Sequence, residues 1–135
     1  MTVFDLDNEE KGAWFDMEGG GRVQIQVLSP SDWIKINKAT VKRGDPIVKE
    51  IGGGKYQLFE REILDRDLQI EMCNDMSIVT WENLFDGKNN PIPCTKENKA
   101  RLMFMKDNRF RDFVNEKIGI LNGIETERKE TAEKN

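Results

Sequence analysis

Two runs of three consecutive glycines, residues 19–21 and 52–54, strongly constrain how the N-terminal half of this chain can fold. Consecutive glycines supply positive φ at little steric cost, which a tight turn between strands requires. Strand-like segments flank each run, and Val23, Ile25 and Val27 alternate with polar residues in one of them. We therefore expect two β-hairpins in one small antiparallel sheet, with strands over residues 13–17 and 22–28 and over residues 47–51 and 55–59.

The first glycine run could also be interpreted as a phosphate-binding loop. Such a loop needs the pattern GxxxxGK[ST] and a following helix. Residues 19–21 lack that pattern, and a polar strand follows them. The sequence therefore favours a turn.

A helix is predicted between the hairpins, beginning at Ser29-Pro30-Ser31-Asp32. Ser or Asp can accept hydrogen bonds from the free N–H groups of the first turn, and proline fits that turn because it has no N–H. We expect the helix to continue to about Lys42 and to end at Gly44-Asp45-Pro46. Its apolar stripe comprises Trp33, Ile34, Ile36 and Val41.

From about Glu60 the hydrophobic period changes from two to near 3.6, which predicts a helix. This helix, or an extended continuation of it, should reach a polar turn at residues 86–90, with Trp81 near a helix end. Thr95 then caps a further helix, with Glu97 in its first turn. The apolar face of the helix after Glu60 comprises Ile63, Leu64, Leu68, Met72 and Met76.

The last helix is predicted from about Arg109 to Glu130, after a break at Asp107-Asn108. After Ile124 the chain carries no apolar residue except Ala132. The chain should therefore have an α+β fold with N-terminal antiparallel β-hairpins and a C-terminal helical part. We expect a loose N-terminal segment over residues 1–12, a single α+β domain over residues 13–124 and a charged, disordered tail over residues 125–135.

Charge and composition exclude several classes of function. The net charge is −4, from 21 basic and 25 acidic residues, and a nucleic-acid-binding protein needs a basic footprint. Lys35, Lys38, Lys42 and Arg43 are interpreted as the solvated face of a helix, with a phosphate-binding patch as the alternative. The N-terminus has no signal peptide, and no apolar stretch approaches the roughly 20 residues that span a bilayer. We expect a cytoplasmic protein without nucleic-acid or membrane partners.

The sequence offers no convincing catalytic or metal site. It contains no histidine, which removes Ser-His-Asp and Cys-His catalysis and the commonest transition-metal ligand. Cys73 and Cys94 form no CxxC pair; we expect reduced thiols, and a bridge between them stays open. The acids Asp65, Asp67 and Glu71 could bind Mg²⁺ or Ca²⁺ but lack EF-hand spacing, so a solvated helix face is favoured. No cofactor, metal or catalytic residue is predicted.

Apolar residues of the C-terminal helices are the candidate binding site. Methionines and aromatics suit a hydrophobic core, and they also suit an adaptable groove for a partner helix. The C-terminal helix has more apolar residues than one contact face requires, so both interpretations can hold. The candidate partner-binding residues are Met103, Phe104, Phe110, Phe113, Val114, Ile118 and Leu121.

One long stretch of the chain resembles a known family. It contains Ile78-Val79, then Trp81-Glu82 and Leu84, then Asp86-Gly87-Lys88, then Pro91-Ile92-Pro93-Cys94-Thr95-Lys96-Glu97-Asn98-Lys99, and later Phe110 and Phe113. This pattern resembles the tail assembly chaperones of long-tailed bacteriophages and prophages. The upstream hairpin–helix–hairpin portion is similar to the N-terminal region of the same group.

The resemblance implies a non-enzymatic protein of the host bacterial cytoplasm. Such chaperones are thought to coat the helical tape measure protein and to give way as the major tail protein polymerises around it. These two proteins are therefore the expected partners, and a homo-oligomer is left open. The alternative is a structural minor tail or head–tail connector protein that is retained in the virion.

Overall fold

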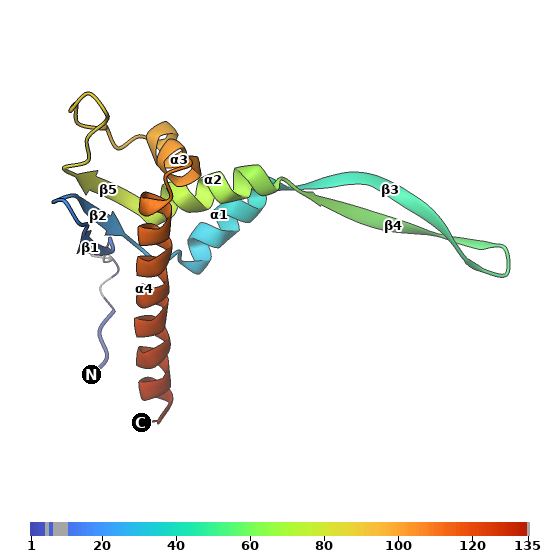
Figure 1. Ribbon diagram of the computed structural model, residues 1–135. Coiled ribbons are helices and arrows are strands. Elements are labelled where there is room, and N and C mark those ends of the chain that lie inside the picture. The colour runs from blue at the N-terminus through green and yellow to red at the C-terminus, as the bar shows by residue number, and fades with distance from the viewer. Residues whose placement is uncertain (5, 7–10, 135) are drawn as a thin grey trace. The chain divides into compact units, whose positions relative to one another are not determined.

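The computed structural model describes residues 1–4, 6 and 11–134, with side chains described as far as Ile124. The α+β class predicted from the sequence is confirmed. The contacts divide the chain into a sheet unit, Met1–Leu28 with Asn74–Asn135, and an arm unit, Ser29–Cys73. Along the described residues the elements are β1 (Ala13–Asp16), β2 (Arg22–Ile25), α1 (Pro30–Thr40), β3 (Val41–Gly52), β4 (Lys55–Leu64), α2 (Arg66–Ser77), β5 (Ile78–Glu82), α3 (Lys96–Phe104) and α4 (Arg109–Lys134) (Figure 1).

The sheet unit contains a three-stranded antiparallel sheet in the order β1-β2-β5. The first expected hairpin, β1 and β2, is confirmed. Its turn is closed by the N–H of Met17, which donates to the carbonyl oxygen of Gly21 at 2.7 Å. Gly19 and Gly20 have φ of 95° and 96°, which side chains other than glycine rarely adopt. The glycine run therefore works as a turn, as the sequence predicts.

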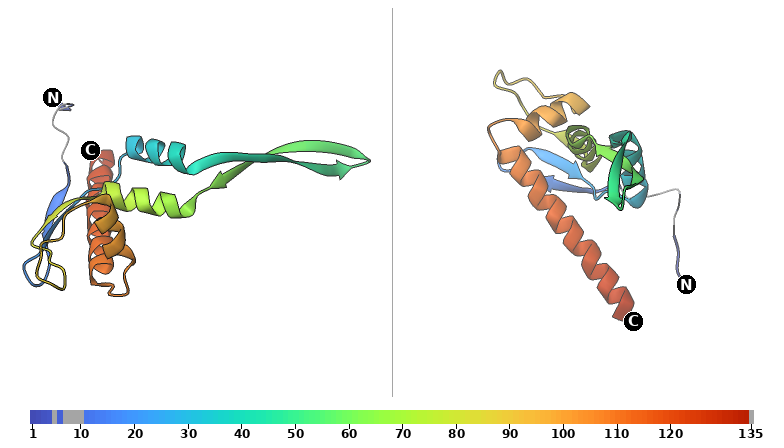
Figure 2. Two further views of the ribbon diagram at one scale, coloured as in Figure 1. Left: turned by 90° about the horizontal axis from the view of Figure 1, so that it is seen from above. Right: turned by 90° about the vertical axis from the view of Figure 1, so that its right-hand side faces the viewer.

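The core of the sheet unit lies on one face of this sheet. Val23, Ile25 and Ile78 are fully buried there, and α3 and α4 cover them. The first turns of α4 lie beside β2, as the right-hand view of Figure 2 shows. Burying one such side chain contributes about 1.5–3 kcal/mol. The buried cluster comprises Val23, Ile25, Ile78, Trp81, Met103, Phe110 and Val114.

Trp81 lies in a strand, so the prediction that it lies near a helix end is wrong. Its indole Nε1–H donates to the carbonyl oxygen of Ile92 at 2.7 Å, and its ring packs nearly perpendicular to that of Phe110 with centroids 5.8 Å apart. The extended alternative considered for residues 78–81 is the correct one. The β-branched Ile78, Val79 and Thr80 favour a strand, where they pack well on a pleated surface.

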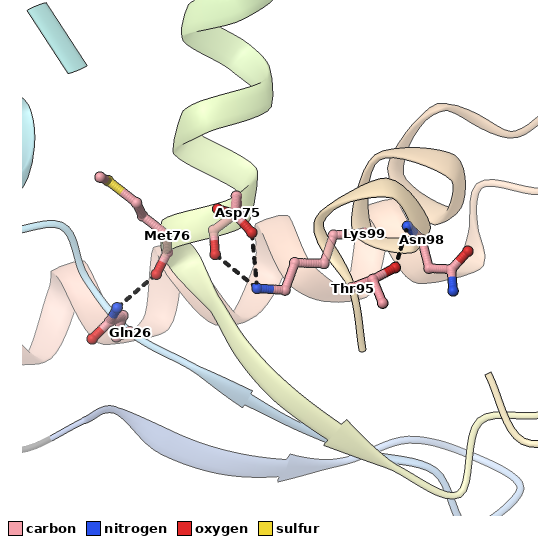
Figure 3. Close-up of polar contacts among 6 residues, drawn as sticks. All are labelled: Gln26, Asp75, Met76, Thr95, Asn98 and Lys99. Atoms are coloured by element: carbon pink, nitrogen blue, oxygen red, sulfur yellow. Dashed lines mark hydrogen bonds and ion pairs between the residues drawn. The ribbon is translucent and has the colours of Figure 1, made fainter. Parts of the chain in front are cut away.

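A buried lysine joins α3 to the last turn of α2, which belongs to the sheet unit from Asn74 onward (Figure 3). The ammonium of Lys99 in α3 donates to the backbone oxygen of Asp75 at 3.0 Å and to its carboxylate at 3.1 Å, near the C-terminal end of α2. Cations are favourable at that end of a helix because the last carbonyls have no partner within the helix. The same turn is held by Gln26, whose amide donates to the carbonyl oxygen of Met76 at 2.6 Å.

The predicted turn and cap before α3 are confirmed. The carboxylate of Asp86 accepts from the N–H groups of Lys88 and Asn90, which closes the turn at residues 86–90. The hydroxyl of Thr95 accepts from the N–H of Asn98, as an N-cap should (Figure 3). Asp86 and Thr95 thus both bind backbone N–H groups of their own segment, as the sequence predicts.

The arm unit begins with α1, whose start is predicted correctly and whose end is not. Ser29 and Asp32 form a capping box, with each side chain accepting from the other's backbone N–H. The helix ends at Thr40, before the expected end near Lys42, because Val41 already has extended backbone and belongs to β3. Lys42 and Arg43 are therefore strand residues, which corrects their interpretation as part of a helix face.

The second hairpin, β3 with β4, is longer than predicted and forms a sheet of its own. The expectation that both hairpins share one sheet is wrong. The prediction of a helix from Glu60 is also wrong over residues 60–64, because these residues belong to β4. The helix α2 begins at Arg66, and the Asp65 side chain caps it by accepting a hydrogen bond from the N–H of Leu68. A short apolar run fits both periods, so periodicity alone could not separate strand from helix.

The expected terminal segments extend beyond what the structure describes. Residues 5, 7–10 and 135 lie outside the described residues, as do the side chains after Ile124. The backbone of α4 is helical to Lys134. The predictions of a loose segment over residues 1–12 and of a disordered tail over residues 125–135 therefore stay predictions.

A two-stranded arm as the candidate functional site

The most unusual element is the hairpin of residues 41–64, which we call the arm. It runs as a twisted two-stranded ribbon from the end of α1 to the start of α2 (Figure 1). Its base is closed by the N–H of Asp65, which donates to the carbonyl oxygen of Thr40 at 2.8 Å. Its tip is the second glycine run, with positive φ at all three residues. With strands of 12 and 10 residues, the arm is long for a hairpin.

The arm leaves its apolar side chains exposed. Every residue of β4 is exposed, and none in β3 is fully buried. Val48 and Leu58, which lie directly opposite each other, are each 61% exposed, and Tyr56 is 67% exposed. The exposed large apolar residues of the arm are Val48, Ile51, Tyr56, Leu58, Phe59, Ile63 and Leu64.

Such a hairpin gains little from its own packing. A two-stranded ribbon is at best marginally stable in water, and exposed apolar surface of this extent usually marks a site where something binds. The sheet unit has a core of its own, made of residues outside 29–73. The arm therefore contributes nothing to that core and is the strongest candidate for an interaction surface.

The register of the arm defines two faces, because paired residues share a face and successive residues alternate. One face carries the pairs Val41–Leu64, Arg43–Glu62, Val48–Leu58 and Glu50–Tyr56. The other carries Lys42–Ile63, Gly44–Arg61, Ile47–Phe59 and Lys49–Gln57. The assignment agrees with the ammonium of Lys49, which lies over the ring of Phe59 at 5.9 Å from its centroid.

A β-bulge interrupts the pairing of β3 with β4 between the pairs Gly44–Arg61 and Ile47–Phe59. The register shifts between Gly44 and Ile47, so that Asp45 and Pro46 together lie opposite Glu60. Proline has no N–H to offer a further strand, and a bulge twists an edge away. The outer edge of β3 is thereby protected against strand addition, whereas both apolar faces remain open.

The residues predicted from the sequence to bind a partner lie mainly in the core of the sheet unit. Met103, Phe110 and Val114 are at most 5% exposed and pack in that core, so the structure places them in the interior of the sheet unit, and their role in binding a partner stays a prediction. Phe113, Ile118 and Leu121 are partly buried and pack against the same core. Phe104 differs from the others, being 60% exposed.

The acidic and cysteine side chains considered as metal or catalytic groups have ordinary structural positions in the described residues. In the described part of the chain, no three Cys, Asp or Glu side chains gather in a way that could hold a metal ion. Asp65 is used as a helix cap, and Glu60 and Glu62 lie on the strand β4. Cys73 and Cys94 are free thiols, and burial raises the pKa of the Cys73 thiol. A raised pKa keeps this thiol protonated at neutral pH, which makes it a poor nucleophile.

The sequence carries a signal for the arm in the residue pattern of β4. The second hairpin was predicted, but its length and exposure were not, because residues 41–46 and 60–64 were assigned to helices or their ends. Strand β4 mixes charged and apolar residues on both faces, whereas a strand lying on a core alternates between them. Such a pattern indicates a ribbon with two open faces.

Comparison of the chain with protein-family models, with curated proteins and with solved structures finds no match. Among the helices that the structure describes, none has the length and apolar character needed to cross a bilayer.

Proposed function

We propose that this chain is a non-enzymatic tail assembly chaperone of a bacteriophage or prophage, which binds the tape measure protein in the bacterial cytoplasm. The observation that carries the proposal is the arm, with large apolar side chains exposed on both faces. The resemblance of residues 78–99 to this family supports the same function. The major tail protein is the second expected partner, since it displaces the chaperone when it polymerises.

The physical argument concerns what a tape measure protein needs. A long helix that exposes apolar stripes aggregates unless another surface covers them. A ribbon with two open faces can lie along such a helix, and covering apolar surface contributes roughly 25 cal/mol per Å². Because the arm does not use this surface for its own fold, binding does not require any of the sheet unit's core to open.

Co-expression with the tape measure protein of the same genome tests the proposal. We expect the partner to become soluble and to co-purify with the wild-type chain. The double substitution Leu58→Ser with Phe59→Ser alters both faces of the arm and should abolish co-purification. The matched control, Phe85→Ser, removes an aromatic side chain that is 55% exposed in the segment after β5 and should leave the complex intact. A partner that stays insoluble with the wild-type chain would refute the proposal.

Purified virions separate the proposal from its alternative. A chaperone leaves before the tail is complete, so mass spectrometry of virions should not detect this chain. Detection in amounts comparable to those of minor tail proteins would favour a structural protein of the tail or connector.

A further inference from the structure

The two faces of the arm differ in the sign of their charge. One face carries four basic side chains, Lys42, Lys49, Lys55 and Arg61, and no acidic one. We call it the basic face. The opposite face carries Glu50, Glu60 and Glu62 with the single cation Arg43. The alternation of a β-strand thus separates charges that are mixed in the sequence.

Apolar and basic groups alternate along the basic face. Ile47 lies directly opposite Phe59, and this pair has Lys49 on one side and Arg61 on the other. Gly44 keeps the face clear beside Arg61, because a Cβ at Gly44 would come within 2.8 Å of Ile63 Cδ1. The face therefore presents the apolar pair Ile47–Phe59 with two cations on each side, Lys42 and Arg61 toward the base and Lys49 and Lys55 toward the tip.

The cations of this face are not neutralised within the chain. Among the residues that the structure describes, none of Lys42, Lys49, Lys55 and Arg61 forms an ion pair, and all four residues are exposed. Unpaired cations beside exposed apolar side chains suit a ligand that has carboxylates next to an apolar stripe.

The spacing matches an α-helix. Lys42 lies opposite Ile63, two residues from Arg61 on β4, and Lys49 lies opposite Gln57, two residues from Lys55. A step of two residues along a strand is about 6.6 Å, so each of these cation pairs is separated by about that rise. Residues i and i+4 of a helix are separated by about 6 Å along its axis. We propose that the basic face of the arm binds an acidic amphipathic helix, in which carboxylates at i, i+4 spacing border an apolar stripe. The inference rests on the proposed function, and it names the chemistry of the tape measure segment that is bound.

Other ligands fit the face less well. A nucleic acid offers phosphates but no apolar stripe for Ile47, Phe59 and Ile63, and the chain as a whole has a net charge of −4. An added β-strand would bind through the backbone of an edge and would be largely insensitive to the charge of one face. Both alternatives give distinct results in the experiment below.

Two labelled peptides of about 21 residues test the inference by fluorescence anisotropy with the full chain. The peptides share one apolar stripe and differ only in having Glu or Lys at the flanking positions. We expect the acidic peptide to bind at least tenfold more tightly than the basic peptide at low salt. This preference should shrink as the salt concentration rises, because exposed charges are screened.

A matched pair of variants assigns the preference to one face. Lys49→Glu and Arg43→Glu make the same change of charge on the same strand but on opposite faces. Lys49→Glu should remove most of the preference for the acidic peptide, and Arg43→Glu should retain it. Far-UV circular dichroism of both variants checks that the arm still forms. The inference would be overturned if both variants lost the preference for the acidic peptide equally, or if the wild-type chain showed no such preference.

The remaining outcomes are also decisive. Duplex DNA could bind as tightly as the acidic peptide and lose this binding in the Lys49→Glu variant. That result would indicate that the basic face binds phosphate groups, and it would overturn the inference. The wild-type chain could co-purify with the tape measure protein and yet show no preference between the two peptides. That result would leave the proposed function intact and overturn this inference alone. If the tape measure protein does not co-purify with the wild-type chain, the proposed function itself is refuted.

Discussion

At the scale of single residues, Trp81 connects β5 to the segment before α3 and to α4. It is buried, donates a hydrogen bond to the carbonyl oxygen of Ile92 and packs nearly perpendicular to the ring of Phe110. Trp81→Phe removes the indole N–H and leaves a cavity and an unpaired carbonyl. We expect a loss of about 1–3 kcal/mol in the free energy of unfolding, measured by chemical denaturation.

Trp33 provides the control for that substitution. Its side chain is 42% exposed on α1. Trp33→Phe should change the free energy of unfolding by less than about 0.5 kcal/mol. If both variants lost the same free energy of unfolding, the hydrogen bond and ring contact of Trp81 would not be what stabilises the fold.

Asp107, immediately before α4, gives a prediction about pH. The Arg109 side chain donates to its carboxylate, with the shortest contact at 2.7 Å, and this lowers the pKa of Asp107. A folded pKa below the unfolded value stabilises the fold at pH values above the unfolded pKa. The contribution is lost as the pH falls through the folded pKa. NMR titration should give Asp107 a pKa below the usual value of about 3.9. Arg109→Gln should raise it, and an unchanged value would refute the assigned cause.

At the scale of elements, the contact between Lys99 and Asp75 should fix α3 to the last turn of α2. Lys99→Met keeps the apolar stem and removes the two hydrogen bonds of the ammonium. We expect a loss of about 1.5–3 kcal/mol in the free energy of unfolding, because the acceptors include a charged group. The control Lys106→Met alters an exposed lysine after α3 and should have little effect. Equal effects would show that the buried contact is not stabilising.

Elements with local signals could be predicted from the sequence. The glycine turn at residues 19–21, the cap at Ser29 and the cap at Thr95 each depend on neighbours in the chain, and all three are confirmed. The limits of α1 and β4 could not be predicted. They depend on the pairing of Val41 with Leu64, residues that are far apart in sequence and that both also fit a helical stripe.

The candidate site was harder to predict than the fold. The apolar stripe of α4 was correctly found, but a stripe does not tell whether the chain itself or a partner covers it. Phe110 and Val114 of this stripe, with Met103 of α3, cover the sheet of their own unit. Taken singly, the exposed residues of the arm look like ordinary strand residues in sequence. The mixing of charged and apolar residues on both faces of β4 distinguishes them in the sequence, and the exposure of every β4 residue distinguishes them in the structure.

At the scale of the whole molecule, the core of the sheet unit and the apolar surface of the arm are made of different residues. Replacing residues 45–60 by Asn-Gly would join Gly44 to Arg61, which are paired, through a two-residue turn. We expect the Tm of the transition monitored by tryptophan near-UV circular dichroism to shift by less than about 3 °C. Co-purification with the tape measure protein should be lost. A large fall in Tm would show that the arm stabilises the fold.

The glycine tip of the arm also has a practical consequence. Nothing lies within 4 Å of a Cβ placed at Gly52, Gly53 or Gly54, and Lys49 and Lys55 flank this turn. A segment with so few tertiary contacts opens locally at low free energy, so trypsin should cut readily at this tip. The free protein thus carries a built-in cleavage site. Slower cutting would reveal an occupied arm in a crude lysate, before any partner has been purified.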